Sequence, residues 1–178
     1  GGGTPSREKD KYWKGSIPWA TVKDLTNSHL TSTEESITNL GLKESACNLI
    51  QKNTIILATR MAVGRAVTFS IDVAINQDLK ALYPNHKVNQ NFLHHWFKFK
   101  EQVLISMASG STVKGIRLET IRLIEINLPP LPEQKKIAAI LSDTDKSIKE
   151  KQRKLEKTID LKKALMNDLL TGKVRVAV

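Results

Sequence analysis

Two arginines bracket a short turn that contains a glycine, and their spacing is suited to recognition chemistry. Arg60 and Arg65 flank Met61-Ala62-Val63-Gly64, directly after a β-branched run that predicts a strand. A guanidinium holds five N–H donors in a rigid fork, which fits the acceptors on a guanine edge or the oxygens of a phosphate. The pattern favours a loop that binds nucleic acid. The plainer alternative for each residue is a solvated surface charge.

A second loop carries a lysine among small residues. Lys114 lies in Ser109-Gly110-Ser111-Thr112-Val113-Lys114-Gly115, where small side chains would let the backbone approach a duplex closely. Other lysines near predicted strands offer further phosphate contacts. The candidate DNA-binding residues are Arg60, Arg65, Lys114, Ser111, Thr112, Lys14, Lys23 and Lys52.

The sequence lacks a recognisable set of catalytic or metal-binding residues. Cys47 is the only cysteine, and His94 and His95 are adjacent, so on a helix they would face different directions. No Gly-x-x-x-x-Gly-Lys-Ser/Thr loop indicates an ATP site. Asp78-Leu79-Lys80 matches the end of a common nuclease signature, but such triplets arise by chance. We therefore expect no catalysis, no metal and no cofactor in this chain.

The charge of the chain favours an acidic partner. Net charge is +10, and residues 1–132 and 133–178 contribute equally to it. Double-stranded DNA is one such partner. No apolar run is long enough for a membrane span. A single cysteine is consistent with a reducing cytoplasm, where we expect the protein to reside.

The first three quarters of the chain predict an α+β domain over residues 1–130. Its clearest elements are a strand over 54–59 and a helix over 89–108, whose apolar residues recur at helical spacing and indicate core. Pro18 predicts an edge position for a strand over 17–22, because proline lacks a ladder donor. Mixed strands and helices without a βαβ rhythm predict a mixed sheet. Further predicted elements are strands over 66–69, 72–75 and 121–128, and a short helix near 33–40.

The rest of the chain predicts one long helix over residues 131–172, followed by a tail over 173–178. Pro132 fits the first helical position, and neither proline nor glycine recurs before Gly172. About 40 residues at ~1.5 Å each make a helix of roughly 60 Å, too long to lie along a domain of this size. A partial heptad seam predicts a partner helix. The seam residues are Ile137, Leu141, Ile148, Leu155, Ile159, Leu165 and Leu169.

Several segments, in order along the chain, carry a family resemblance. They are Gly2-Gly3-Thr4-Pro5-Ser6, Tyr12-Trp13-Lys14-Gly15-Ser16-Ile17-Pro18-Trp19, Asn76-Gln77-Asp78-Leu79, the segment from Leu128 through Pro-Pro-Leu-Pro-Glu-Gln to Ser142, and Leu169-Leu-Thr-Gly-Lys-Val-Arg175. Together they resemble the specificity subunits of type I restriction–modification systems. Each segment alone is weak, whereas the ordered set is specific.

The resemblance implies a target recognition domain that reads one half of a bipartite DNA site. It also implies that the long helix pairs antiparallel with a second helix, sets the distance between half-sites and docks methyltransferase subunits. Restriction subunits would join that complex. S-adenosylmethionine, ATP and Mg would belong to those other subunits, so this chain would be non-catalytic by itself.

The chain departs from that family in carrying one recognition domain and one helix. It is expected to form a homodimer, or to be half of a longer specificity subunit whose second half is missing here. The family pattern also usually begins some residues before the Gly-Gly-Thr-Pro segment. Two other classes stay open: a catalytic fragment of a DNA methyltransferase or nuclease, and a coiled-coil adaptor without a DNA role.

Overall fold

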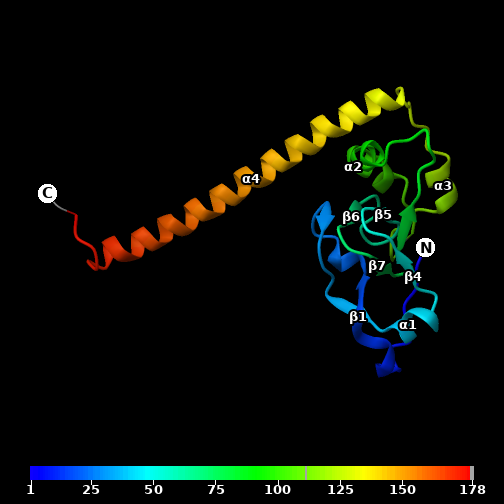
Figure 1. Ribbon diagram of the computed structural model, residues 1–178, viewed down its shortest axis with the longest axis horizontal. Helices are drawn as coiled ribbons and strands as arrows, with labels where there is room; N and C mark the ends of the chain where they lie inside the picture. The colour runs from blue at the N-terminus through cyan, green and yellow to red at the C-terminus, as the bar shows by residue number, and fades with distance from the viewer. Residues whose placement is uncertain (111, 177–178) are drawn as a thin grey trace. The chain divides into compact units, whose positions relative to one another are not determined.

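The computed structural model of the chain describes residues 1–110 and 112–176. Contacts divide the chain into two units, Gly1–Lys135 and Lys136–Val178. Figure 1 colours the chain from its N-terminus to its C-terminus and labels helices α1 to α4 and several of the strands. The strands are β1 (Trp13–Ala20), β2 (His29–Leu30), β3 (Glu35–Ile37), β4 (Asn48–Ile50), β5 (Ile55–Ala58), β6 (Ala66–Phe69), β7 (Val73–Ile75) and β8 (Leu79–Leu82). The helices are η1 (Asp10–Tyr12), η2 (Val22–Asp24), α1 (Asn39–Lys43), α2 (Gln90–Ser106), α3 (Leu118–Arg122) and α4 (Leu131–Leu170).

The strands of the first unit form two mixed sheets. One has the order β3-β1-β7-β4 and the other β2-β6-β5-β8. In the first sheet β1 and β7 run parallel, with Trp19 opposite Ala74. In the second sheet β2 and β6 run parallel, while β5 is antiparallel to both its neighbours. The predicted α+β class with a mixed sheet is confirmed, although there are two such sheets.

The main core lies between the two sheets, and strand alternation explains it. Every residue of β5 is buried. Ile56 and Ala58 belong to the cluster shared with the other sheet, whereas Ile55 and Leu57 belong to the cluster that includes α2. Successive side chains of a strand point to opposite faces, so a strand covered on both faces reads as a continuous apolar run.

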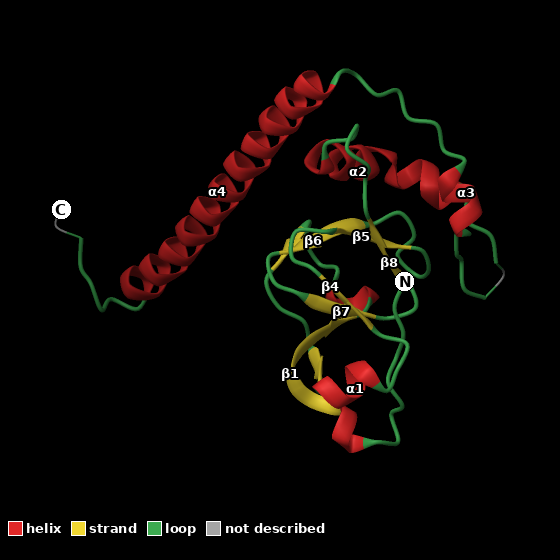
Figure 2. Ribbon diagram, turned by 45° about the vertical axis from the view of Figure 1, so that its right-hand side comes forward, coloured by secondary structure: helices red, strands yellow, loops and turns green. Residues whose placement is uncertain are grey.

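Helix α2 covers the outer face of the second sheet (Figure 2). Asn89 caps it by accepting a hydrogen bond from the N–H of Phe92 at 3.0 Å. Phe97 and Leu104 are buried against β5, as the aromatic and apolar spacing predicts. The predicted core role of this stripe is confirmed, except that Met107 is 45% exposed at the helix end.

Three local predictions are wrong. Residues 121–128 form no strand; α3 ends at Arg122, and the segment after it finds no strand to pair with. The short helix expected near residues 33–40 begins only at Asn39, because Ile37 pairs with β1 as part of β3. Strand β1 is also not an edge strand. Pro18 is tolerated because β7 pairs with β1 only at Trp19 and Ala20, beyond the proline.

Helix α4 has 40 residues, and the prediction of one long helix is confirmed. It begins at Leu131, the first residue of the predicted range, and ends at Leu170, two residues before the predicted end at Gly172. Gln134 ties the first turn to the rest of its unit. Its amide donates to the carbonyl oxygens of Lys87 and Pro129, and its Oε1 accepts from the N–H of Asn89 at 2.7 Å.

The C-terminal end of α4 is closed by glycine. Gly172 has φ +72° and donates to the carbonyl oxygen of Leu169 at 3.2 Å. The N–H of Val174 then reaches the carbonyl oxygen of Asp168 at 3.0 Å. This pairing satisfies carbonyls that the helix leaves open, and it matches the predicted stop.

Candidate nucleic-acid interface

The structure brings the two predicted recognition loops together. β5 ends just before Thr59, whose carbonyl oxygen accepts the N–H of Ile116 at 2.8 Å. The N–H of Met61 reaches the carbonyl oxygen of Lys114 at 3.3 Å. Arg60 and Gly115 form an isolated antiparallel bridge between these contacts. Arg60 and Lys114, which are far apart in sequence, therefore lie on paired segments of backbone.

The loop that carries Lys114 is closed at its base. Ser109 and Gly115 exchange two backbone hydrogen bonds of 2.9 Å each. Gly110 has φ +128°, a conformation that side chains disfavour. Thr112 and Lys114 are exposed. Ser111, also predicted to contact DNA, lies outside the described residues.

The guanidinium of Arg60 is exposed at the surface and also contacts a neighbouring carboxylate. Its side chain is 53% exposed. Nη1 lies 3.5 Å from Oδ1 of Asp78, which is a nearly buried carboxylate. A methyl group on Gly115 would lie 3.1 Å from Cγ of Arg60, so the lack of a side chain there makes room for the arginine stem. An exposed cationic fork of this kind can bind a base edge or a phosphate.

Arg65 makes more contacts within the protein than Arg60 does. Its Nη1 donates to the carbonyl oxygen of Leu25 at 2.9 Å. Its Nε lies 3.9 Å from Oε1 of Glu101 on α2. The side chain lines a polar surface pocket together with Thr26 and other residues of the η2–β2 connection. A DNA contact by Arg65 would therefore need either the N–H donors that these internal contacts leave free or the breaking of those contacts.

The remaining predicted lysines lie on other elements. Lys14 is in β1 at the irregularity between Trp13 and Ile17, and its φ of +57° is rare for a residue with a side chain. Lys23 is exposed in η2. Lys52 is exposed in the turn after β4, where its N–H donates to Asp72 at 2.8 Å.

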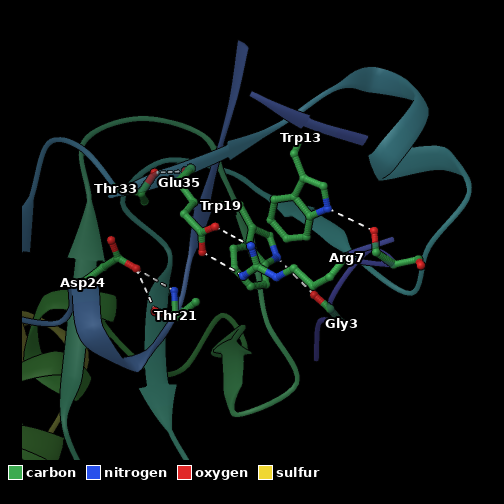
Figure 3. Close-up of polar contacts among 9 residues, drawn as sticks. Gly3, Arg7, Trp13, Trp19, Thr21, Asp24, Thr33 and Glu35 are labelled. Atoms are coloured by element: carbon green, nitrogen blue, oxygen red, sulfur yellow. Dashed lines mark hydrogen bonds and ion pairs between the residues drawn. The ribbon is translucent and has the colours of Figure 1, made fainter. Parts of the chain in front are cut away.

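A cluster around Arg7 was missed by sequence reasoning (Figure 3). The guanidinium lies 3.8 Å from the ring centroid of Trp13 and donates two hydrogen bonds to the carboxylate of Glu35. The hydrogen bond from Arg7 lowers the pKa of Glu35, and the same bond raises the pKa of Arg7. The indole N–H of Trp19 donates to the carbonyl oxygen of Gly3 at 3.1 Å. These contacts hold the N-terminal segment on the first sheet.

Tight packing accounts for the glycines of that segment. A methyl group on Gly2 would lie 1.8 Å from the carbonyl oxygen of Ile75. The N–H of Gly3 donates to the same oxygen at 3.0 Å, and its carbonyl oxygen accepts the thiol of Cys47 at 2.9 Å. Only residues without a side chain allow such close backbone approach. The Gly-Gly-Thr-Pro segment is therefore built into the fold.

Histidines and acids do not assemble into a reaction centre in the part of the chain that the structure describes. No three His, Cys, Asp or Glu side chains there are placed to hold a metal ion. His94 is buried, and its Nε2 lies 3.2 Å from the carbonyl oxygen of Ala66. Burial lowers the pKa of His94 to about 4, so the ring is neutral at pH 7.

The predicted pairing residues lie along α4 with much of their apolar surface open. Leu155 is 60% exposed. Ile137 is half-buried, and Leu141, Ile148, Ile159, Leu165 and Leu169 are exposed. Leu161, Met166 and Leu170 add exposed apolar surface near the C-terminal end of the helix. No helix among residues 1–110 and 112–176 is both long and apolar enough to cross a membrane.

Comparison with known proteins finds similarity to DNA specificity proteins along most of the chain. A family model described as type I restriction modification DNA specificity domain matches residues 1–159. The type I restriction enzyme MjaIX specificity subunit of Methanocaldococcus jannaschii is 34% identical, over 88% of this chain and 37% of its own length. The EcoR124I/EcoR124II specificity subunit of Escherichia coli is 30% identical, over 82% and 38% respectively.

Solved structures share the fold. A chain from a study of complex assembly and conformational transition of the type I R-M system has a TM-score of 0.71 at 19% identity, covering 94% of this chain and 41% of that one. The HsdS subunit from Thermoanaerobacter tengcongensis has a TM-score of 0.63 at 19% identity, covering 85% and 36%. The chain thus spans about two fifths of the length of the proteins it matches.

Proposed function

The chain belongs to the family of type I restriction modification DNA specificity domains, and from that premise we propose that it reads one half of a bipartite DNA target. In this proposal it is a specificity component without catalysis of its own. Methyl transfer, ATP hydrolysis and DNA cleavage, with S-adenosylmethionine, ATP and Mg, belong to methyltransferase and restriction subunits. Its predicted location is the cytoplasm, where those subunits would meet DNA.

One observation carries the proposed DNA contact. Arg60 and Lys114 come from two loops whose backbones are hydrogen-bonded to each other, and both side chains reach the surface. An arginine fork discriminates bases by bidentate hydrogen bonds, whereas a lysine supplies a point charge to a phosphate. The pair therefore combines a base contact with a positioning contact in one site.

The long helix supports a second part of the proposal, which is pairing with another helix. Leu141, Ile148, Leu155 and Leu169 occupy positions related by multiples of seven residues, interrupted by Lys162. On a straight helix such a row drifts by about 20° per heptad, so continuous contact favours a left-handed supercoil. We propose that α4 pairs antiparallel with a second copy, or with the second half of a longer subunit, and also docks methyltransferase subunits.

Homodimerisation would have a consequence for the target. Two copies related by a twofold axis read the same bases on opposite strands, so the target would be an inverted repeat. The helix pair would set the length of the unread spacer between the half-sites.

Selection from a library of duplexes with a randomised core tests the proposal directly. The expected result is enrichment of one short motif by the chain, and the same motif should lose methylation in the host when the gene is deleted. Methylation or cleavage by the chain alone would favour the enzyme alternative. Dimerisation without salt-dependent DNA binding would favour the adaptor alternative.

A further inference from the structure

Asp78 is a nearly buried acid that the proposed DNA contact does not use directly. It lies between β7 and β8, and its side chain is 10% exposed. Its Oδ2 accepts a hydrogen bond from the side-chain amide of Asn76 at 3.3 Å. Its Oδ1 is buried and has no hydrogen-bond partner among the described residues. Leaving a buried carboxylate oxygen without a donor is costly, so this arrangement calls for an explanation.

The backbone around Asp78 is tied to the strand end that carries the recognition arginine. Its carbonyl oxygen accepts both the N–H of Thr59, at 2.8 Å, and the hydroxyl of Thr59, at 3.0 Å. The side chain of Asn76 accepts the N–H of Asp78 at 3.1 Å and thereby fixes the turn. The carboxylate is consequently anchored beside Arg60 by contacts that do not involve Arg60.

The unsatisfied oxygen faces the guanidinium. Oδ1 of Asp78 is the atom that lies 3.5 Å from Nη1 of Arg60. The stem of Arg60 runs close to Gly115, where an added methyl group would lie 3.1 Å from its Cγ, so the glycine leaves room for the stem. The ion pair with Asp78 is therefore the contact that restrains this exposed guanidinium. Burial lowers the pKa of Lys80 and the charge of Asp78 opposes that shift, while the ammonium donates to the carbonyl oxygen of Gln77.

We propose that Asp78 is a positioning residue that orients Arg60 for base discrimination; this inference rests on the proposed function. An ion pair through Nη1 engages one end of the fork and leaves other N–H donors for the ligand. Fixing the fork before binding lowers the entropy lost when it meets a base edge. The carboxylate also reduces the local positive charge, which weakens contacts with phosphates of any sequence and so sharpens the preference for the correct base.

Selection from the randomised duplex library, with the full chain, separates this role from a structural one. Arg60→Ala should lose about 10-fold preference at one base position, as expected for one bidentate contact. Asp78→Asn should relax the same position by a similar factor, and the double variant should lose no more than Arg60→Ala alone. Asp78→Asn should also bind duplexes of unrelated sequence about twofold more tightly, because a negative charge is gone. Asp72→Asn is the charge-matched control, since it removes a carboxylate that accepts the backbone N–H of Lys52 and has no ion pair with Arg60 among the described residues; it should leave the motif unchanged.

Thermal unfolding gives a readout that needs no DNA. The fall in melting temperature caused by Asp78→Asn should be smaller in the Arg60→Ala background than in the wild type, because the pair is already broken. Asp78→Ser replaces Asp78→Asn in both experiments if the latter does not fold. An unchanged motif for the Asp78 variant, or weaker binding to every sequence, overturns the positioning role. A wild-type chain that enriches no motif overturns the proposed function itself, and with it this role, whatever the melting temperatures show.

Discussion

Leu155→Asp is expected to separate the proposed helix pair, and the magnitude follows from the exposed surface. Leu155 is 60% exposed in the single chain. Full burial of a leucine side chain stabilises by about 1.5–3 kcal/mol, so covering the exposed part contributes about 1–2 kcal/mol for each copy. Two copies lose about 2–4 kcal/mol, which raises the dissociation constant of the dimer by about 30-fold to 1000-fold. Burying an unpaired carboxylate adds to this loss.

Sedimentation equilibrium over a micromolar concentration series measures the effect. Ala164→Asp is the matched control, because it adds the same charge and a similar helix-propensity cost at an exposed position outside the heptad row. The control should keep the wild-type dissociation constant. Helix pairing through Leu155 is refuted if Leu155→Asp dimerises as tightly as the control. A wild-type chain that stays monomeric throughout refutes homodimerisation altogether.

Three further predictions concern DNA binding, pH and packing. Lys114→Ala should weaken binding to all sequences alike and reduce the salt slope by about 1 in filter-binding titrations; a loss confined to one base position would contradict a phosphate contact. The pKa of His94 is lowered by burial in the folded chain, so as the pH falls this side chain takes up a proton in the unfolded state at a higher pH than in the folded state. The free energy of unfolding should therefore fall by up to about 3 kcal/mol as the pH drops from 6.5 towards 4. The free energy of unfolding of His94→Gln, measured in urea, should not show this part of the pH dependence. A pH profile identical to that of the wild type would contradict the prediction. Gly2→Ala should destabilise by about 1–3 kcal/mol, because its methyl group would overlap the carbonyl oxygen of Ile75. Gly1→Ala, which meets only a flexible lysine, is the control, and equal melting temperatures for the two variants would contradict this.

Local pattern predicted the elements that carry their own signal. The long helix follows from a proline near its start, a glycine after its end and no breaker between, all of which act within a few residues. β5 and β6 were predicted at Thr54–Thr59 and Ala66–Phe69 because their residues are apolar and β-branched, and the structure places them at Ile55–Ala58 and Ala66–Phe69. The apolar spacing of α2 likewise marked Phe97 and Leu104 as core.

Local pattern failed where pairing partners decide the outcome. The isoleucines in residues 121–128 favour a strand, but a strand forms only beside another strand. Instead, Ile121 and Ile124 pack on the cluster beneath α2. Pro18 by itself predicts an edge strand, but β1 is paired on both sides because its second partner, β7, begins beyond the proline. Neither fact is encoded within a few residues of the position concerned.

The amino-acid sequence by itself determined that this chain has an α+β domain and a helix of 40 residues. It also supplied the ordered motifs that identify the family. Only the tertiary structure decided that Arg60 and Lys114 share one surface, that Arg65 is held by Leu25 and Glu101, and that Asp78 faces Arg60. The physical reason is range: helix periodicity and capping act over one or two turns, whereas the paired loops meet through backbone hydrogen bonds between segments more than 50 residues apart.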